Sequence, residues 1–193
     1  MADKGGDFER KMSREFSLWW SNNKADDIFW RNRIRITSNT PSKERQLGDT
    51  TAVRGEGIPF SETICLELKT GYSKTKKGSR VKNIPWDLLD FIDGKDQGKV
   101  LREFWYQTRT AADIAKKLPL LVFKRDFHKE CWCTDKHTLV TLERYCGKNQ
   151  NRPLITLDTG KEVLYMGSLQ SFFDWVSPET IIELWKDKRG YDY

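Results

Sequence analysis

The heptapeptide TICLELK, residues 63–69, carries the clearest strand signal in this chain of 193 residues. Aliphatic residues at 64, 66 and 68 alternate with Cys65, Glu67 and Lys69, and alternate side chains of a β-strand point to opposite faces. The pattern predicts a strand with one aliphatic and one charged face, which we expect to be central in a sheet. Glu67 and Lys69 would lie about 7 Å apart along it, and both are costly to bury without partners. The alternative is an edge strand with a solvated charged face.

Asp49 opens the β-rich segment DTTAV, residues 49–53, which precedes this strand. We expect the two segments to pair as a hairpin, which would bring Asp49 close to Glu67. Two carboxylates from adjacent strands, with Lys69 beside them, are typical of a site that holds a divalent cation against a phosphate. Mg²⁺ takes hard oxygen ligands and leaves coordination positions for water and a phosphate oxygen.

The positive charge of the chain is concentrated in two segments that flank these residues. The net charge is +6, but Arg31–Gly48 carries +4 and Thr70–Lys82 carries +5, so the remainder is mildly acidic. Such focusing indicates a polyanionic partner, although two solvated loops would have the same composition. The candidate contacts are the basic residues Arg31, Arg33, Arg35, Lys43, Arg45, Lys74, Lys76, Lys77, Arg80 and Lys82, together with the aromatic Tyr72.

The apolar spacing along the rest of the chain predicts a single α/β domain without repeats. Residues 8–20 form a helical stripe, and Asp7 is placed to be its N-cap. Further helices are expected at 86–92, 99–117, 169–175 and 178–186. Further strands are expected at 28–30, 120–124, 138–142 and 154–157.

Two other features bear on function. His128, Cys131, Cys133, His137 and Cys146 lie close together in the sequence, but their spacing matches none of the usual zinc knuckles. A zinc site and ordinary core cysteines both stay open, and the latter is favoured. No long apolar run and no apolar region within Met1–Arg10 are present, so we expect no membrane span, no secretory signal and a cytoplasmic protein.

Asp49, followed after 17 residues by Glu67-Leu68-Lys69, resembles the Asp…(Asp/Glu)-x-Lys signature of the PD-(D/E)XK nuclease superfamily. Residues 6–10, GDFER, resemble the Gly-x-x-x-Glu-Arg helix of archaeal-type Holliday junction resolvases. Segments 17–20, 27–31 and 67–73 look like phage-encoded nucleases of this superfamily. The resemblance covers about residues 5–125. It departs from the resolvases at residues 32–39, which contain no glycine where those enzymes carry a Ser-Gly pair.

The resemblance implies a restriction-endonuclease-like core, a central mixed β-sheet flanked by helices, over residues 1–125. Residues 126–193 would then be an α+β extension packed on the same domain. It also implies that Glu9, Asp49 and Glu67 are ligands of Mg²⁺, with Mn²⁺ as a substitute, and that Lys69 is the catalytic lysine. Gln107 on the long helix would support the active site. Lys124 and Arg125 end a strand beside that core and are either further phosphate contacts or a solvated strand end.

The implied function is a Mg²⁺-dependent DNA endonuclease that acts on branched DNA in the manner of a Holliday junction resolvase. It would work as a homodimer, with the Trp19-Trp20 end of the first helix as an interface, in the host cytoplasm if phage-encoded. The alternatives are a sequence- or duplex-specific endonuclease or nickase on the same fold, and a non-catalytic DNA-binding module. A zinc-dependent interaction protein is the third.

Overall fold

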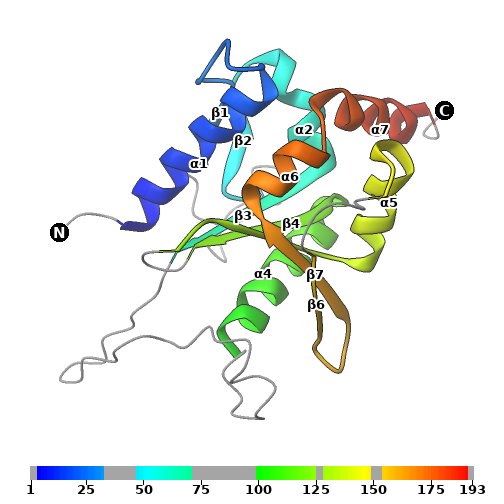
Figure 1. Ribbon diagram of the computed structural model, residues 1–193. Helices are drawn as coiled ribbons and strands as arrows, with labels where there is room; N and C mark the ends of the chain where they lie inside the picture. The colour runs from blue at the N-terminus through cyan, green and yellow to red at the C-terminus, as the bar shows by residue number, and fades with distance from the viewer. Residues whose placement is uncertain (1–3, 33–46, 71–98, 125–127, 149–153, 191–193) are drawn as a thin grey trace.

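The computed structural model describes residues 4–32, 47–70, 99–124, 128–148 and 154–190. Within them the chain forms a single α/β domain in which helices flank a sheet (Figure 1). The helices are α1 (Lys4–Trp20), η2 (Gly55–Gly57), α2 (Ile58–Thr63), α4 (Lys99–Ala115), α5 (Lys136–Cys146), α6 (Leu169–Trp175) and α7 (Pro178–Gly190). The strands are β1 (Phe29–Arg31), β2 (Thr50–Ala52), β3 (Ile64–Thr70), β4 (Leu118–Lys124), β5 (Cys131–Asp135), β6 (Ile155–Asp158) and β7 (Val163–Ser168).

The main sheet is mixed, as the family resemblance implies. Its order is β3-β4-β5-β7-β6, with β3 and β4 parallel and every other pair antiparallel. Parallel neighbours need a long crossover, and α4 lies in the one between β3 and β4. Residues from 131 onward supply three of these five strands, so the last third of the chain completes the same sheet.

Two expectations about strand pairing are wrong. Segment 49–53 does not form a hairpin with β3, because β2 pairs with β1 in a separate antiparallel ribbon and α2 intervenes before β3. The strand β3 is not central either, since it ends the sheet order among the described strands. The alternation that predicted its two faces is nevertheless present: Ile64, Leu66 and Leu68 are buried, while Glu67 and Lys69 are half-buried.

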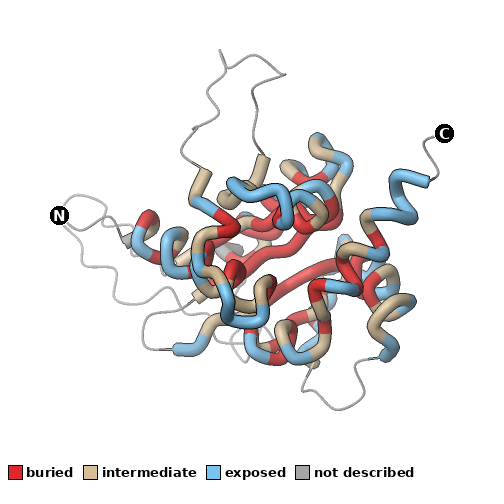
Figure 2. The backbone as a smooth tube through the Cα atoms, turned by 90° about the horizontal axis from the view of Figure 1, so that it is seen from above, coloured by how far each residue is buried: buried red, intermediate tan, exposed pale blue. Residues whose placement is uncertain are grey.

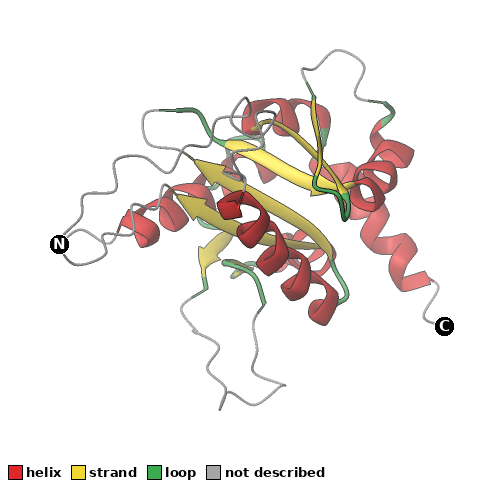
Figure 3. Ribbon diagram, turned by 90° about the horizontal axis from the view of Figure 1, so that it is seen from below, coloured by secondary structure: helices red, strands yellow, loops and turns green. Residues whose placement is uncertain are grey.

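The two faces of the sheet have different covers. On one face the aliphatic side of β3 and β4 packs with α1, α2, α5, α6 and α7 in the larger core cluster. On the other face α4 packs on Leu121 and Phe123 of β4, and Figure 3 shows this helix lying across the strands. Buried residues lie along the sheet at the centre of the domain, and exposed residues gather on the outer helices (Figure 2).

The apolar end of α1 packs against other elements of the same chain. Trp19 stacks on Phe173 of α6 with ring centroids 5.2 Å apart, and Trp20 donates its indole N–H to the Glu56 carbonyl at 2.9 Å. Trp20 is only 7% exposed. Contacts with Phe60 of α2 and with α6 therefore account for the apolar residues at this end of the helix, and the dimer interface expected there stays a prediction.

Most of the other predicted helices and strands are present in the structure. The helix expected at 169–175 is confirmed. The helices expected at 99–117 and 178–186 are present at 99–115 and 178–190, and the strands expected at 120–124 and 28–30 are present at 118–124 and 29–31. Asp7 is not an N-cap, since α1 already includes Lys4, and the predicted helix at 86–92 lies outside the described residues. Residues 138–142 are helical rather than extended, because Asp135 caps α5 by accepting the Thr138 N–H at 2.7 Å. None of the described helices is long and apolar enough to cross a membrane.

Candidate active site

Asp49 is fixed against the outer edge of β3 by two hydrogen bonds. Its backbone N–H donates to the Leu66 carbonyl at 2.8 Å, and its carboxylate accepts the Leu68 N–H at 2.6 Å. Gly48 makes this approach possible, since it has φ +93° and a Cβ there would lie 2.9 Å from the Leu66 carbonyl oxygen. The loop before β2 therefore brings Asp49 to β3, although by a route other than the predicted hairpin.

Glu67 and Lys69 form an ion pair on the face of β3 that meets α4. Lys69 Nζ lies 2.5 Å from Glu67 Oε1, and each side chain is 14% exposed. Across the sheet they stand opposite Leu121 and Phe123 of β4. Lys69 Nζ also lies 5.9 Å from the centroid of the Phe104 ring of α4, within range of a cation–π contact. The two charges are thus buried with a partner, which removes most of the cost of burying either alone.

The surroundings of the Asp49 carboxyl disfavour its ionised form. Its pKa is raised from 3.8 to about 7, first by burial, then by the negative charge of Glu67, with a smaller effect of Glu9 in the same direction. Lys69 and the Leu68 N–H act against this rise in pKa. Near neutral pH the group is therefore about half protonated, and any nearby cation would favour its ionised form.

Glu9 reaches this neighbourhood from α1. Its carboxylate lies 2.6 Å from Nε of Arg31, the last residue of β1, and both side chains are largely buried, at 21% and 28% exposed. Three carboxylates from α1, the loop before β2, and β3 thus influence one another. Each of the two glutamates is balanced by a cation, and Asp49 is the acid whose ionised form is least favoured.

Two of the three predicted ligands, Asp49 and Glu67, have oxygen donors that suit a hard divalent cation. Among the described residues, no three His, Cys, Asp or Glu side chains gather closely enough to hold a metal ion. Mg²⁺ commonly binds through one or two carboxylates and completes its shell with water and phosphate oxygens. Asp49 and Glu67 supply such oxygens, and a cation between them would relieve the repulsion that raises the pKa of Asp49. Glu9 is engaged with Arg31 in this structure.

The candidate zinc residues do not converge. His128, Cys131, Cys133, His137 and Cys146 all lie in the part of the chain that the structure describes, and they form no group able to bind a metal there. Cys133 is fully buried, which raises the pKa of its thiol well above 9.0. It packs with the core on the α4 face of the sheet, as expected for an ordinary core cysteine.

Most of the predicted DNA contacts lie outside the described residues. These are Arg33, Arg35, Lys43, Arg45, Tyr72, Lys74, Lys76, Lys77, Arg80 and Lys82, together with Arg125. Arg31 is described and binds Glu9, and Lys124 forms an ion pair with Glu130 at 2.9 Å. Gln107 is exposed and lines a pocket with Tyr106 and Lys161, between α4 and the β6–β7 hairpin.

The sequence-based predictions missed one group of basic residues near the site. Arg10 and Arg14 are separated by one helical turn of α1, and together with Arg31 they line a pocket between this helix and β1. The spacing of four is visible in the sequence and places both side chains on one helix face. Both residues lie outside the two segments in which positive charge is concentrated, so charge focusing alone does not reveal them.

The comparisons with known proteins give one match. The model of the family described as "Phage putative PDDEXK endonuclease" matches residues 1–183. No curated protein and no solved structure matches the chain.

Proposed function

Because the chain belongs to this phage PDDEXK endonuclease family, we propose that it is a Mg²⁺-dependent endonuclease that cleaves DNA phosphodiester bonds at the β3 edge. The observation that carries the proposal is the proximity of Asp49 and Glu67, which have 17 residues between them. The Asp49 carboxylate accepts the Leu68 N–H and is affected by the charge of Glu67, which pairs with the half-buried Lys69. Carboxylates facing a polyanion would repel it unless a cation intervenes. This argues for catalysis over a module that only binds DNA.

Asp49 and Glu67 would hold the cation, with Glu9 as a third acid available when Arg31 moves from it. A bound divalent cation lowers the pKa of a bound water and neutralises charge at the scissile phosphate. Lys69 would orient the attacking water or stabilise the extra negative charge that develops on the phosphate. Its ion pair with Glu67 and its contact with the Phe104 ring fix the ammonium group in position before DNA arrives.

We further propose branched DNA as substrate and a homodimer as the active form, so that two active sites cut paired strands. Duplex DNA with or without a preferred sequence is the second candidate. Phosphate contacts position a protein on DNA without reading its bases, so the basic residues suit either substrate.

The experiment compares a labelled four-way junction with a linear duplex of the same sequence, each with Mg²⁺ or with EDTA. Glu67→Gln and Lys69→Met are the test variants, and Glu183→Gln, which removes an exposed carboxylate from α7, is the matched control. We expect cleavage to fall about a thousand-fold or more in Glu67→Gln, since several kcal/mol of cation-derived stabilisation would be lost.

The outcomes separate the candidates. Paired nicks near the branch point of the junction alone, lost in both test variants and in EDTA, support a junction-cleaving enzyme. Equal cutting of both substrates retains the nuclease and removes the junction preference. Absence of cleavage by the wild-type protein, with DNA binding that persists without metal, would contradict the catalytic proposal.

A further inference from the structure

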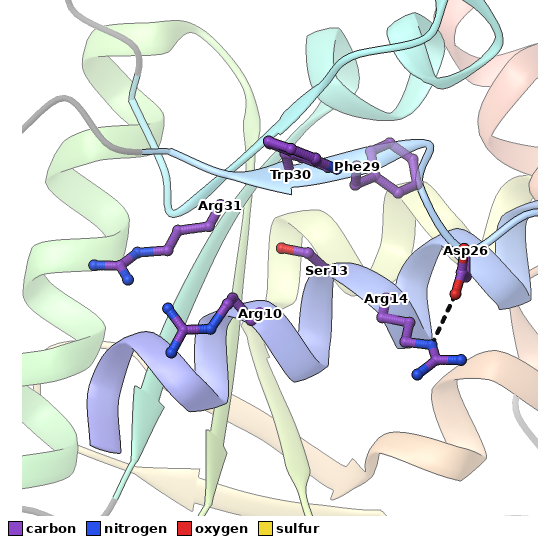
Figure 4. Close-up of a pocket in the computed structure, with 7 residues that line it drawn as sticks. All are labelled: Arg10, Ser13, Arg14, Asp26, Phe29, Trp30 and Arg31. Carbon is purple, nitrogen blue, oxygen red and sulfur yellow. Dashed lines mark ion pairs between the residues drawn. The ribbon is translucent and has the colours of Figure 1, made fainter. Parts of the chain in front are cut away.

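A pocket of about 570 Å³ lies between α1 and β1, next to the candidate active site (Figure 4). This volume falls within the range of about 300–1,000 Å³ typical of small-ligand sites. Its lining includes three arginines, one exposed aromatic ring and two smaller polar groups: Arg10, Arg14, Arg31, Trp30, Ser13 and Asp26.

The arginines suit a phosphate. Figure 4 shows that Arg10 and Arg31 extend from different elements toward the same end of the pocket, whereas Arg14 pairs with Asp26 at the other end. Arg10 and Arg14 are bound to Asp7 and Asp26, but their side chains are 57% and 68% exposed. Ion pairs this exposed contribute little, so a phosphate can compete for these guanidinium groups, which match its oxygens in a bidentate geometry.

Trp30 is the aromatic component, and it differs from the other tryptophans that the structure describes. Five of these donate their indole N–H to an acceptor within the chain, and Trp105 is 2% exposed. Trp30 is 54% exposed. An exposed indole is a surface on which a nucleobase stacks, and in a continuous duplex the faces of the bases are already occupied.

The pocket adjoins the carboxylates through Arg31, because this residue both lines it and contacts Glu9. We propose that it binds an unpaired nucleotide of the DNA strand beside the phosphodiester that is cleaved. Trp30 stacks on the base, and Arg10 and Arg14 bind the adjoining phosphates. The inference rests on the proposed nuclease function and narrows its substrate to DNA with unpaired nucleotides next to the cleavage position.

The test measures binding without cleavage. Fluorescence anisotropy in EDTA gives the Kd of a labelled 12-nucleotide single strand and of the matching duplex over a series of salt concentrations. The variants are Trp30→Ala, Trp30→Phe, and Arg10→Ala combined with Arg14→Ala. The matched control combines Lys136→Ala with Arg144→Ala, which removes two exposed cations from α5. Circular dichroism melting verifies that each variant is folded.

We expect Trp30→Ala to weaken single-strand binding about ten-fold, since stacking on one base contributes that much, and to leave duplex binding nearly unchanged. Trp30→Phe should restore most of the loss. The double arginine variant should lower the magnitude of the salt slope for the single strand by about 1.4, which is about 0.7 for each lost phosphate contact. The α5 control should leave both Kd and the slope unchanged.

The inference is overturned if Trp30→Ala leaves single-strand binding unchanged, if it weakens duplex binding equally, or if the wild-type protein binds neither DNA. Failure of the nuclease proposal looks different. In that case the wild-type protein does not cleave DNA with Mg²⁺, whatever the binding variants show.

Discussion

Glu130 and Asp49 are half-buried carboxylates whose pKa values are shifted in opposite directions. Glu130 accepts hydrogen bonds from Lys11 of α1 at 2.8 Å and from Lys124 at the end of β4 at 2.9 Å. Burial tends to raise the pKa of Glu130, but these bonds outweigh it and lower the pKa to about 2. Asp49 has Glu67 and Glu9 as acidic neighbours, and the nearby Lys69 is already paired with Glu67. Burial and the repulsion from these acids raise the pKa of Asp49 to about 7.

The difference separates a structural charge cluster from a functional one. Glu130 has two lysines as direct partners and no carboxylate among the causes of its pKa shift, so the ionised acid stabilises the contact between α1 and the sheet. Around Asp49 the carboxylates exceed the adjacent cations, and the folded chain bears the cost of that excess. Acids held in this unfavourable state mark candidate functional sites, and a divalent cation would remove the imbalance.

Among the changes that test this comparison between Glu130 and Asp49, the largest effect is expected from displacing Asp49 without changing any charge. Gly48→Ala places a Cβ 2.9 Å from the Leu66 carbonyl at φ +93°, so the loop must shift and the Asp49 carboxylate must leave its bond to the Leu68 N–H. A misplacement of about 1 Å costs about a hundred-fold in rate. We expect this loss in kcat for DNA cleavage. Gly55→Ala is the control, since nothing lies within 4 Å of its Cβ, and an unchanged kcat in Gly48→Ala would contradict the placement of Asp49.

The second effect concerns the structural cluster. Glu130→Gln removes the negative charge to which Lys11 and Lys124 both donate hydrogen bonds. The free energy of unfolding should therefore fall by about 1–3 kcal/mol at pH 7. Because the folded pKa is lowered, this contribution is present above about pH 4.5 and is lost as the pH falls toward 2. Urea titrations at pH 7, 5 and 3.5 should therefore show the two proteins converging. A constant difference across these pH values would mean that side-chain contacts, rather than charge, carry the effect.

The charged face of β3 was predictable because it depends on local alternation alone. The pairing of Glu67 with Lys69 follows from two positions on one face of a strand, and the burial of aliphatic residues on the other face follows in the same way. Asp49 was placed near Glu67 correctly but for the wrong reason. The choice of strand partner is made by distant residues, here β1, and by Gly48, whose left-handed conformation the sequence pattern did not reveal.

The pocket between α1 and β1 and the helix α5 were missed for two further reasons. The pocket joins Arg10 and Arg14 to Trp30 and Arg31 across a turn, and only the tertiary contact of β1 with α1 brings them together. A strand was expected at residues 138–142, whereas the Asp135 cap favours the helix α5. The helix also buries Leu139 and Leu142, which are three residues apart, in the larger core cluster.

The smallest expected effect is the one most specific to the functional cluster. Asp49→Asn keeps an acceptor for the Leu68 N–H but removes a charge that the metal-free fold disfavours. Because the folded pKa of Asp49 is raised, the wild-type protein loses stability as the pH rises from about 4 to about 7, and the variant does not. In EDTA at pH 8 the variant should melt about 2–4 °C higher, a gain of about 1 kcal/mol for a chain of this size, with the gap closing below pH 4. Added Mg²⁺ should raise the melting temperature of the wild-type protein and not that of Asp49→Asn. If the substitution lowered the melting temperature at pH 8, the repulsion between Asp49 and Glu67 would not be the property that distinguishes this cluster from that of Glu130.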